Sequence, residues 1–415
     1  MTAIAHPARA RLSIDRKFMP LMATVAMFAI IYAVGFLSFP AMRGSQPFFN
    51  LLITQPFLLI SVVGETFVII SGGIDLSVGG VIALTTVVTA AMLQGGWDPV
   101  VAPELEFYLV EQNKDADYPL RPPVGRSGRA EPGRQSYSIA AVNEFDPLFD
   151  DIYQFCEDQD IEIDTLIHED GPAQMEINLI HGQPLDLADQ AFLFKRTARE
   201  AALRHKMYAT FMAKPHAKEP GSAMHIHQSV VDVKSRKNIF SNPDGTPSTL
   251  FFNHIGGLQR YLPAAMALFC ANVNSYRRLT RYLSAPINVH WGYDNRTAGL
   301  RVPMSDAQAR RVENRVGGAD ANPYIAIAAS LACGYLGMTE GIQPSDPIVG
   351  SAHDLPFGLP RSLDEALREL RACEPLVKLL GEPFIEAFTI VKEAEYEVFL
   401  QVISSWEREH LLLNV

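Results

Sequence analysis

The segment VAPELEFYLV (residues 101–110) decides how the larger, second part of this chain is interpreted. Its two acids, Glu104 and Glu106, stand two residues apart in an otherwise apolar run. Because side chains alternate across a β-strand, both carboxylates are predicted on one face and Leu105 on the other. Neighbouring acids repel each other and lose hydration, so a cation is expected between them. A solvated strand face remains the alternative for the pair taken alone.

Polar side chains further along the chain favour a binding site over that alternative. Glu169 ends one strand-like run, and Glu176 lies in the next. The segment GSAMHIHQS (residues 221–229) also has the pattern of a strand, and its alternation puts three polar side chains on one face: His225, His227 and Ser229. A histidine packed in the core is the alternative for either imidazole.

Arginines are concentrated between short β-like segments in the next part of the chain: Arg277, Arg278, Arg281, Arg296, Arg301, Arg310, Arg311 and Arg315. In ARRVENR (residues 309–315), Arg311, Glu313 and Arg315 alternate, so a carboxylate is predicted between two guanidiniums. On a surface this is a mixed-charge strand, whereas in a cleft it would clamp phosphate and carboxylate groups. The sequence has no GxxxxGK[ST], GxGxxG or GxSxG motif, so any ATP would be held by metals and arginines.

Length, charge and cysteine content exclude several classes of protein. The 415 residues can form two or three domains. The formal net charge of −11 argues against a nucleic-acid-binding surface. The four cysteines are far apart and form no CxxC pair, so they are expected to be reduced buried thiols and not zinc ligands or disulfides: Cys156, Cys270, Cys333 and Cys373.

The first 99 residues have few charges and three long apolar runs, whereas charges recur every few residues after Val100. Membrane-spanning helices are predicted over about 18–39, 48–71 and 78–93. The basic residues before the first run favour a cytoplasmic N-terminus and an inner-membrane, multi-pass location. The segment SGGIDLSVGG (residues 71–80) breaks the apolar pattern with glycines and Asp75, which is typical of a helix facing protein or water. Three plain anchoring helices are the alternative.

This N-terminal part resembles the start of a permease subunit of bacterial ABC-type sugar importers, of the ribose and galactofuranose kind. The resemblance rests on GETFVIISGGIDLSVGGVIAL (residues 64–84) and covers about residues 15–98. It implies a truncated transmembrane fragment over 1–99, in contact with the lipid bilayer, that should not transport anything. The catalytic part is then expected over 100–415.

Periodicity predicts an alternation of strands and helices in that second part. A proline-rich loop is expected over 113–135. Strands are predicted over 161–168, 174–180, 208–215 and 221–229, and in INVHWGY, AGLRVP and ARRVENR. Helices are predicted over 146–158, 185–206, 250–272, 363–371 and 384–400, and from the Asn322-Pro323 pair onward.

From about Val101 to the C-terminus, the sequence resembles the catalytic domain of the glutamine synthetase family. Its motifs are most similar to those of the γ-glutamylpolyamine (γ-glutamylputrescine) synthetase branch: VAPELEFYLV, GSAMHIHQS, WGYDNRTAGLRVP, ARRVENR, GADANPYIAIAASL and ISSWERE. The resemblance implies an α+β fold in which a curved, mainly antiparallel sheet is backed by helices. Here that fold would follow an α-helical transmembrane segment.

The resemblance also implies roles for individual residues. Two or more Mg²⁺ or Mn²⁺ ions would bind, one to Glu106, Glu169 and Glu176 and the other to Glu104, His225 and Glu313, ligands that suit hard cations. ATP would contact His227, Ser229, Arg296, Arg301 and Arg311. Glutamate would contact Gly221, Arg278 and Arg315. The catalytic residues would be Arg296, Arg315 and Glu313.

The chemistry implied by the resemblance has two steps. The γ-carboxylate of glutamate attacks the γ-phosphate of ATP, and an amine then displaces phosphate from the acyl phosphate. Where glutamine synthetases proper carry a glutamate, this chain has Ser284, which fits an amine other than ammonia. Both ammonia and a polyamine such as putrescine stay open as the substrate.

A second departure concerns the domain that precedes the catalytic domain in the family. That β-grasp domain completes the neighbouring subunit's site in a homo-oligomeric ring, and the permease-like segment stands in its place. Weak or absent activity is therefore expected, and ring assembly is doubtful. The family's catalytic domain is cytoplasmic, whereas three spans would put this one outside the cytoplasm. A membrane-inserted permease fragment with an inactive soluble tail is the alternative function.

Overall fold

The computed structural model describes residues 78–415, apart from 116–117, 132 and 282. The chain divides into two compact units, Met1–Gly79 and Gly80–Val415, and the second unit contains the whole sheet and the helices that cover it. The spans predicted over 18–39 and 48–71 lie outside the described residues.

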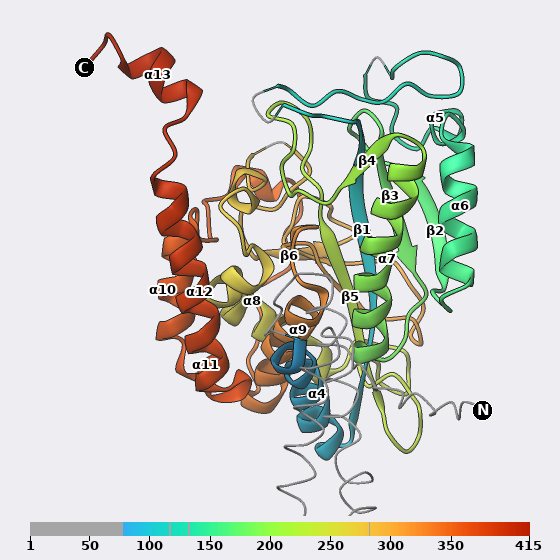
Figure 1. Cartoon of the computed structure of the whole chain (residues 1–415). Coiled ribbons are helices and arrows are strands. Elements are labelled where there is room, and N and C mark those ends of the chain that lie inside the picture. The colour runs from blue at the N-terminus through green and yellow to red at the C-terminus, as the bar shows by residue number, and fades with distance from the viewer. Residues whose placement is uncertain (1–77, 116–117, 132, 282) are drawn as a thin grey trace, which may run out of the picture. The chain divides into compact units, whose positions relative to one another are not determined.

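One sheet forms the centre of this unit (Figure 1). Its strand order is β2-β3-β1-β5-β8-β7-β6, and β4 pairs with the end of β1. Every described pair is antiparallel except β6 with β7, so the prediction of a mainly antiparallel sheet is confirmed. The strands are β1 (Trp97–Glu111), β2 (Ile163–His168), β3 (Gln174–Leu179), β4 (Met207–Thr210), β5 (Met224–Asp232), β6 (Trp291–Tyr293), β7 (Leu300–Val302) and β8 (Val312–Asn314).

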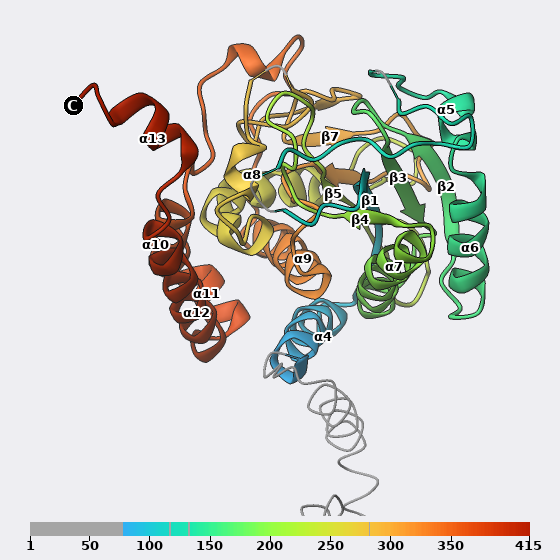
Figure 2. The ribbon, with the colours of Figure 1, turned by 45° about the horizontal axis from the view of Figure 1, so that its top comes forward.

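Helices cover the apolar side of this sheet, and Figure 2 shows α7 and α9 there with α8 beside α9 and α10–α12 further out. The six helices predicted from periodicity are confirmed: α6 (Asp146–Glu157), α7 (Pro184–Arg204), α8 (Thr249–Phe269), α9 (Pro323–Glu340), α10 (Leu363–Ala372) and α12 (Glu382–Leu400). Shorter elements were not predicted: α5 (Ile139–Asn143), η3 (Ser275–Arg277), η4 (Ala352–Asp354), α11 (Glu374–Leu380) and α13 (Ser405–Leu411).

The helices α8 and α9 pack closely because glycines face each other between them. A Cβ atom built on Gly257 would lie 2.6 Å from the Cα atom of Gly337, closer than real Cβ contacts allow. The side chain of Asn322 caps the start of α9 by accepting hydrogen bonds from the amides of Tyr324 and Ile325, and Pro323 occupies the first turn. The sequence therefore sets both the start of α9 and its distance from α8.

The third apolar run is a correction to the prediction of a membrane span over 78–93. It forms α4 (Val78–Gln94), and Leu84, Val88 and Met92, spaced four residues apart, are buried in the same core as the sheet. The Thr85 hydroxyl donates to the Tyr324 carbonyl oxygen at 3.0 Å, next to the start of α9. The apolar character of this run therefore serves packing within the protein.

Among residues 78–415, the three gaps aside, no helix combines the length and the apolar character needed to cross a membrane.

Candidate active site

A cavity of about 450 Å³ opens over the polar face of the sheet. The strand β1 builds its floor, because Leu105, Phe107 and Leu109 point into the core while Glu104 and Glu106 point the other way. Most of the site residues predicted from the sequence line this one cavity: Glu104, Glu106, Glu169, Glu176, Gly221, His225, Arg278, Arg296 and Arg315.

Strand register brings the acids and histidines together from distant parts of the sequence. Glu104 lies opposite His225 in the β1–β5 pair, and Glu106 lies opposite Glu176 in the β1–β3 pair. In the next pair, His227 lies opposite Glu313. Directly opposed residues in antiparallel strands have side chains about 5 Å apart, which suits a shared ligand. The prediction that these side chains converge on one spot is confirmed.

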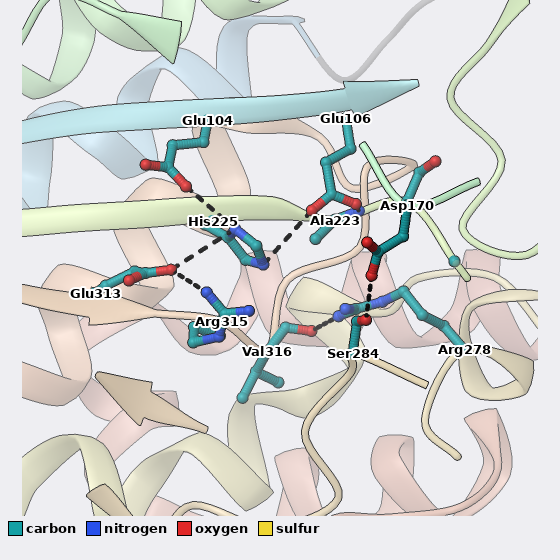
Figure 3. Close-up of polar contacts among 12 residues, drawn as sticks. Glu104, Glu106, Asp170, Ala223, His225, Arg278, Ser284, Glu313, Arg315 and Val316 are labelled. Atoms are coloured by element: carbon teal, nitrogen blue, oxygen red, sulfur yellow. Dashed lines mark hydrogen bonds and ion pairs between the residues drawn. The ribbon is translucent and has the colours of Figure 1, made fainter. Parts of the chain in front are cut away.

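Three groups of carboxylates and imidazoles have ligand atoms within 4.8 Å of one another, close enough to hold a metal ion: Glu106 with Glu169 and Glu176, Glu104 with Glu176 and His225, and Glu104 with His227 and Glu313. The first group is the first predicted metal set. The second predicted set is also in contact, because His225 Nδ1 lies 3.2 Å from Glu104 and 3.7 Å from Glu313 (Figure 3). Carboxylate oxygens with one imidazole fit Mg²⁺ or Mn²⁺.

Glu313 is completely buried between two guanidiniums. Arg301 Nη1 donates to Glu313 Oε2 at 2.6 Å, and Arg315 Nη1 donates to Glu313 Oε1. The sequence predicted Arg311 and Arg315 as the two neighbours, and this is wrong for Arg311. Its Nε donates to His227 Nδ1 at 3.1 Å, because β8 is only three residues long and β7 brings Arg301 opposite Glu313.

The carboxyl groups differ in pKa along the cluster. Burial would raise the pKa of Glu104, but hydrogen bonds from His225 and His227 outweigh it and hold this pKa well below its usual value. Burial also opposes ionisation of Glu313, yet the positive charge of Arg315 brings its pKa to about 2. Burial lowers the pKa of His225 to about 4, with Arg315 adding to the effect, so its neutral ring can ligate a cation.

The pKa values of the group formed by Glu106, Glu169 and Glu176 are shifted upward. Burial raises the pKa of Glu106 to about 8, and the charge of Glu169 adds to the shift. Burial and then the charges of Glu104 and Glu106 raise the pKa of Glu176 well above its usual value. Burial raises the pKa of Glu169 as well, with Asp170 next in effect. Ionisation of all three carboxyls together is therefore unfavourable, and a bound cation would favour it.

Arg278 and Gly221 form the wall beside the acids. Arg278 is 2% exposed and donates to the Val316 carbonyl oxygen. A Cβ atom on Gly221 would lie 2.3 Å from Arg278 Cγ, so only glycine leaves room for this side chain. The Nε atoms of Arg278 and Arg315 are buried without a hydrogen-bond partner among the described residues, which leaves donors for an anion.

The residues predicted to contact ATP are only partly brought together. His227, Arg301 and Arg311 cluster around Glu104 and Glu313 through hydrogen bonds. The exposed Arg296 lies on the cavity wall. Ser229 lies two residues beyond His227 on β5, opposite Val100, and is not among the residues that line the cavity.

Sequence reasoning missed several residues of the site. Tyr137, Asp170 and Gln174 line the cavity, and Gln174 donates to the Gly221 carbonyl oxygen at 3.0 Å. Glu131, in the segment expected to be a loop, lies 3.0 Å from His168 Nε2 and accepts from the Ala173 amide at 2.6 Å. Only the position of Asp170 next to Glu169 in the sequence could have indicated that it belongs to the site. Strand alternation would instead have put its side chain on the opposite face from Glu169.

These features define a site with acidic groups that could hold divalent cations beside arginines able to bind anions, on one face of a mixed sheet. The family model for the glutamine synthetase catalytic domain matches residues 83–411, and the chain therefore belongs to the glutamine synthetase family. Its curated relatives in that family are ligases, and this chain is a glutamine synthetase-family ligase by homology.

The chain is 38% identical to γ-glutamylputrescine synthetase PuuA of Escherichia coli (strain K12) over 327 residues, which cover 77% of this chain and 68% of that protein. It is 34% identical to a glutamate–isopropylamine ligase of a Pseudomonas species, with 76% and 69% covered. The solved structure of a GmaS/ADP complex superimposes with a TM-score of 0.69 at 28% identity, covering 80% of this chain and 77% of that one.

Proposed function

We propose that this chain joins the γ-carboxylate of glutamate to an amine at the expense of ATP, through a γ-glutamyl phosphate intermediate. The observation that carries the proposal is that acids and a histidine close enough to hold cations line one cavity together with Arg278, Arg296 and Arg315. Both a diamine-using and an isopropylamine-using ligase are similar to the chain, which supports an organic amine over ammonia.

The residues divide into those that would hold cations and those that would hold anions. Mg²⁺ or Mn²⁺ would bind to Glu106, Glu169 and Glu176 and to Glu104, His225 and Glu313, and would withdraw charge from the transferring phosphoryl oxygens. Arg278 and Gly221 would receive the glutamate substrate, since Arg278 has an unpartnered donor beside the cavity. Arg296 and Arg315, which line the same cavity, would neutralise the phosphoryl group.

The nucleotide would approach along the β5–β8 edge of the site. His227 and Arg311 form one hydrogen-bonded unit there, and Arg301 stands next to them on Glu313. We assign Arg301 and Arg311 to the ATP phosphates, with His227 and Ser229 on the nucleotide side. Guanidiniums suit this task because their fixed donors match phosphate oxygens in pairs.

The proposed reaction is balanced in two steps. A γ-carboxylate oxygen of glutamate bonds to the γ-phosphorus of ATP while the bond to ADP breaks. The neutral amine nitrogen then bonds to the acyl carbon, the bond to phosphate breaks, and the amine proton leaves with the phosphate. Catalysis of this kind depends mainly on positioning and on charge neutralisation, which a site of acids, histidines and arginines provides.

The test is amine-dependent phosphate release by the purified full chain with ATP, glutamate and Mn²⁺. Ammonia, putrescine and isopropylamine are compared, and the amide product is identified by mass spectrometry. Glu313→Gln should abolish release, whereas Glu157→Gln, on the exposed end of α6, should leave it unchanged. Release that is absent with every amine, or that survives Glu313→Gln, would contradict the proposal.

A further inference from the structure

Asp170 is a carboxylate on the cavity wall that belongs to none of the cation groups. It directly follows Glu169, yet only Glu169 shares a group with Glu106 and Glu176. Its two oxygens accept hydrogen bonds from different loops: Oδ1 from the Ser136 hydroxyl, and Oδ2 from the Ser284 hydroxyl at 3.0 Å. Figure 3 shows Asp170 reaching from the acid group towards Ser284. The carboxylate is thus held in place between two loops.

This carboxylate has acceptor capacity to spare. An ionised carboxylate offers about four lone-pair positions, and the two serines use two of them. No lysine, arginine or histidine among the described residues forms an ion pair with Asp170. A cationic ligand in the cavity could therefore reach an oriented, uncompensated negative charge.

The wall around Asp170 is partly apolar. Leu283 and Ala285 flank Ser284 in the sequence and line the same cavity, and so does Tyr137. The charge of Asp170 contributes to raising the pKa of Tyr137, after burial and the charge of Glu169, so the phenol lies close to both acids. An alkyl chain bound beside Asp170 would thus have apolar side chains of the same cavity to contact.

We propose that Asp170, held by Ser136 and Ser284, binds the far ammonium group of a diamine whose other, neutral end attacks the acyl phosphate. This inference rests on the proposed function and names the substrate class as diamines. The two curated relatives, the putrescine and the isopropylamine ligase, act on amines that differ at this end, since putrescine carries a second amino group and isopropylamine does not. The Asp170 carboxylate would pair with the second ammonium group of a diamine. An amine that ends in a methyl group would leave the carboxylate unpaired beside an apolar group, so the diamine is favoured.

Asp170→Asn is the decisive variant, because asparagine keeps the size of the side chain and its carbonyl oxygen while it removes the charge. The KM for putrescine should rise at least tenfold, and the KM for n-butylamine, which has the same chain length and no second amine, should stay the same or fall. The kcat with n-butylamine should change by less than about twofold. Asp150→Asn, on the exposed face of α6, is the matched control and should change neither KM.

A purely structural role for Asp170 gives a different result. If the carboxylate only ties the loops of Ser136 and Ser284 together, Asp170→Asn and Ser284→Ala should both impair putrescine and n-butylamine equally. That outcome would overturn the inference while the proposed function stood. Failure of the proposed function itself would show as no amine-dependent phosphate release by the unmodified chain.

A binding measurement tests the inference without turnover. Putrescine should raise the midpoint of thermal unfolding of the Mn²⁺-loaded full chain more than n-butylamine does at the same concentration. The difference should vanish in Asp170→Asn and shrink as the ionic strength rises, because an ion pair is screened by salt. Equal shifts for the two amines in the unmodified chain would refute the role of Asp170.

Discussion

The two ends of the carboxylate cluster differ in which groups compensate their buried carboxyls. At the β5–β8 end, Arg301 and Arg315 neutralise Glu313, and the two histidines form hydrogen bonds with Glu104, so the partners of both acids are part of the chain. At the β1–β3 end, Glu106, Glu169 and Glu176 face one another, and none of them forms an ion pair with a described lysine or arginine. The pKa values are accordingly lowered at the first end and raised at the second.

The difference indicates which end depends on a bound cation. The β5–β8 end is compensated by protein groups, so its geometry should persist without metal. At the β1–β3 end, burial and neighbouring acids oppose ionisation, so a bound cation should favour it and metal binding should release protons. Removing an acid should therefore damage the fold at the first end and mainly abolish cation binding at the second.

The largest effect is expected for Glu313→Ala. This change leaves the buried Arg315 without its carboxylate, whereas Arg301 keeps its ion pair with Asp294, and breaking a buried ion pair from one side costs about 3–5 kcal/mol. Phosphate release should fall by at least ~10²-fold, as for the loss of one strong electrostatic group. Urea denaturation and the phosphate assay measure the two losses.

Glu313→Gln is the control for that experiment. It keeps the shape and one acceptor oxygen, so it should recover part of the stability and little of the activity. A Glu313→Ala variant as stable as the parent chain would show that the two guanidiniums do not need Glu313.

The next effect concerns Mn²⁺ and Glu176. Mn²⁺ at about a hundred times its Kd should raise the free energy of unfolding by ~2.7 kcal/mol through mass action. Glu176→Gln should remove most of this gain, because it deletes a ligand of two of the groups that could hold a metal ion. Without metal the same variant should be within about 1 kcal/mol of the parent, since Gln resembles the protonated acid. Thermal unfolding with and without Mn²⁺ gives both values.

The stability and the Mn²⁺ response of Glu176→Gln test whether the β1–β3 end differs from the end that contains Glu313. A strong loss of stability in metal-free Glu176→Gln would mean that the β1–β3 end is compensated by the protein after all. An undiminished response to Mn²⁺ would place the stabilising cation elsewhere.

Glu106 predicts a pH dependence of stability. Its pKa is about 8 in the folded chain against 4.5 for the free group, because of burial first and then Glu169. Between these values the folded chain holds a proton that the unfolded chain has lost. Stability is therefore greatest below 4.5 for this group, and it falls by about 1.4 kcal/mol per pH unit as the pH rises towards 8.

Glu106→Gln should flatten that slope between pH 5.5 and 7.5 in the metal-free protein. Saturating Mn²⁺ should flatten or reverse it in the parent chain, because the cation replaces the proton. Urea denaturation at several pH values provides the slopes. Identical slopes in the parent and in Glu106→Gln would show that Glu106 ionises normally in the folded chain.

Much of the site could be predicted because period-2 alternation is a local property. Glu104 with Glu106, and His225 with His227, needed only the strand pattern of their own segments. The partner of Glu313 needed the register between β7 and β8, which no local pattern contains. That is why Arg311 was predicted where the structure has Arg301.

The fold was predictable where an element is long and periodic, and α7, α8 and α9 follow their sequence patterns closely. Apolar content alone could not distinguish a membrane span from the packed helix α4. Leu84, Val88 and Met92 would be removed from water in either case, by lipid in a span and by the protein core in α4. Asp170 was missed for a related reason. It lies in a turn after β2, where side-chain direction depends on tertiary packing and not on alternation.

The smallest effect is expected for Arg311→Ala, which tests how the β5–β8 end is oriented. Arg311 Nε donates to His227 Nδ1, so the proton of the neutral imidazole must lie on Nε2, where it donates to Glu104 Oε1 at 2.7 Å. Loss of Arg311 should free the other tautomer and raise the KM for ATP about 3- to 10-fold, or ~1 kcal/mol. The Mn²⁺-induced stabilisation, which the β1–β3 end provides, should persist. A loss of that stabilisation would mean that the two ends are coupled through Glu104, the one acid that shares groups with both histidines and with Glu176.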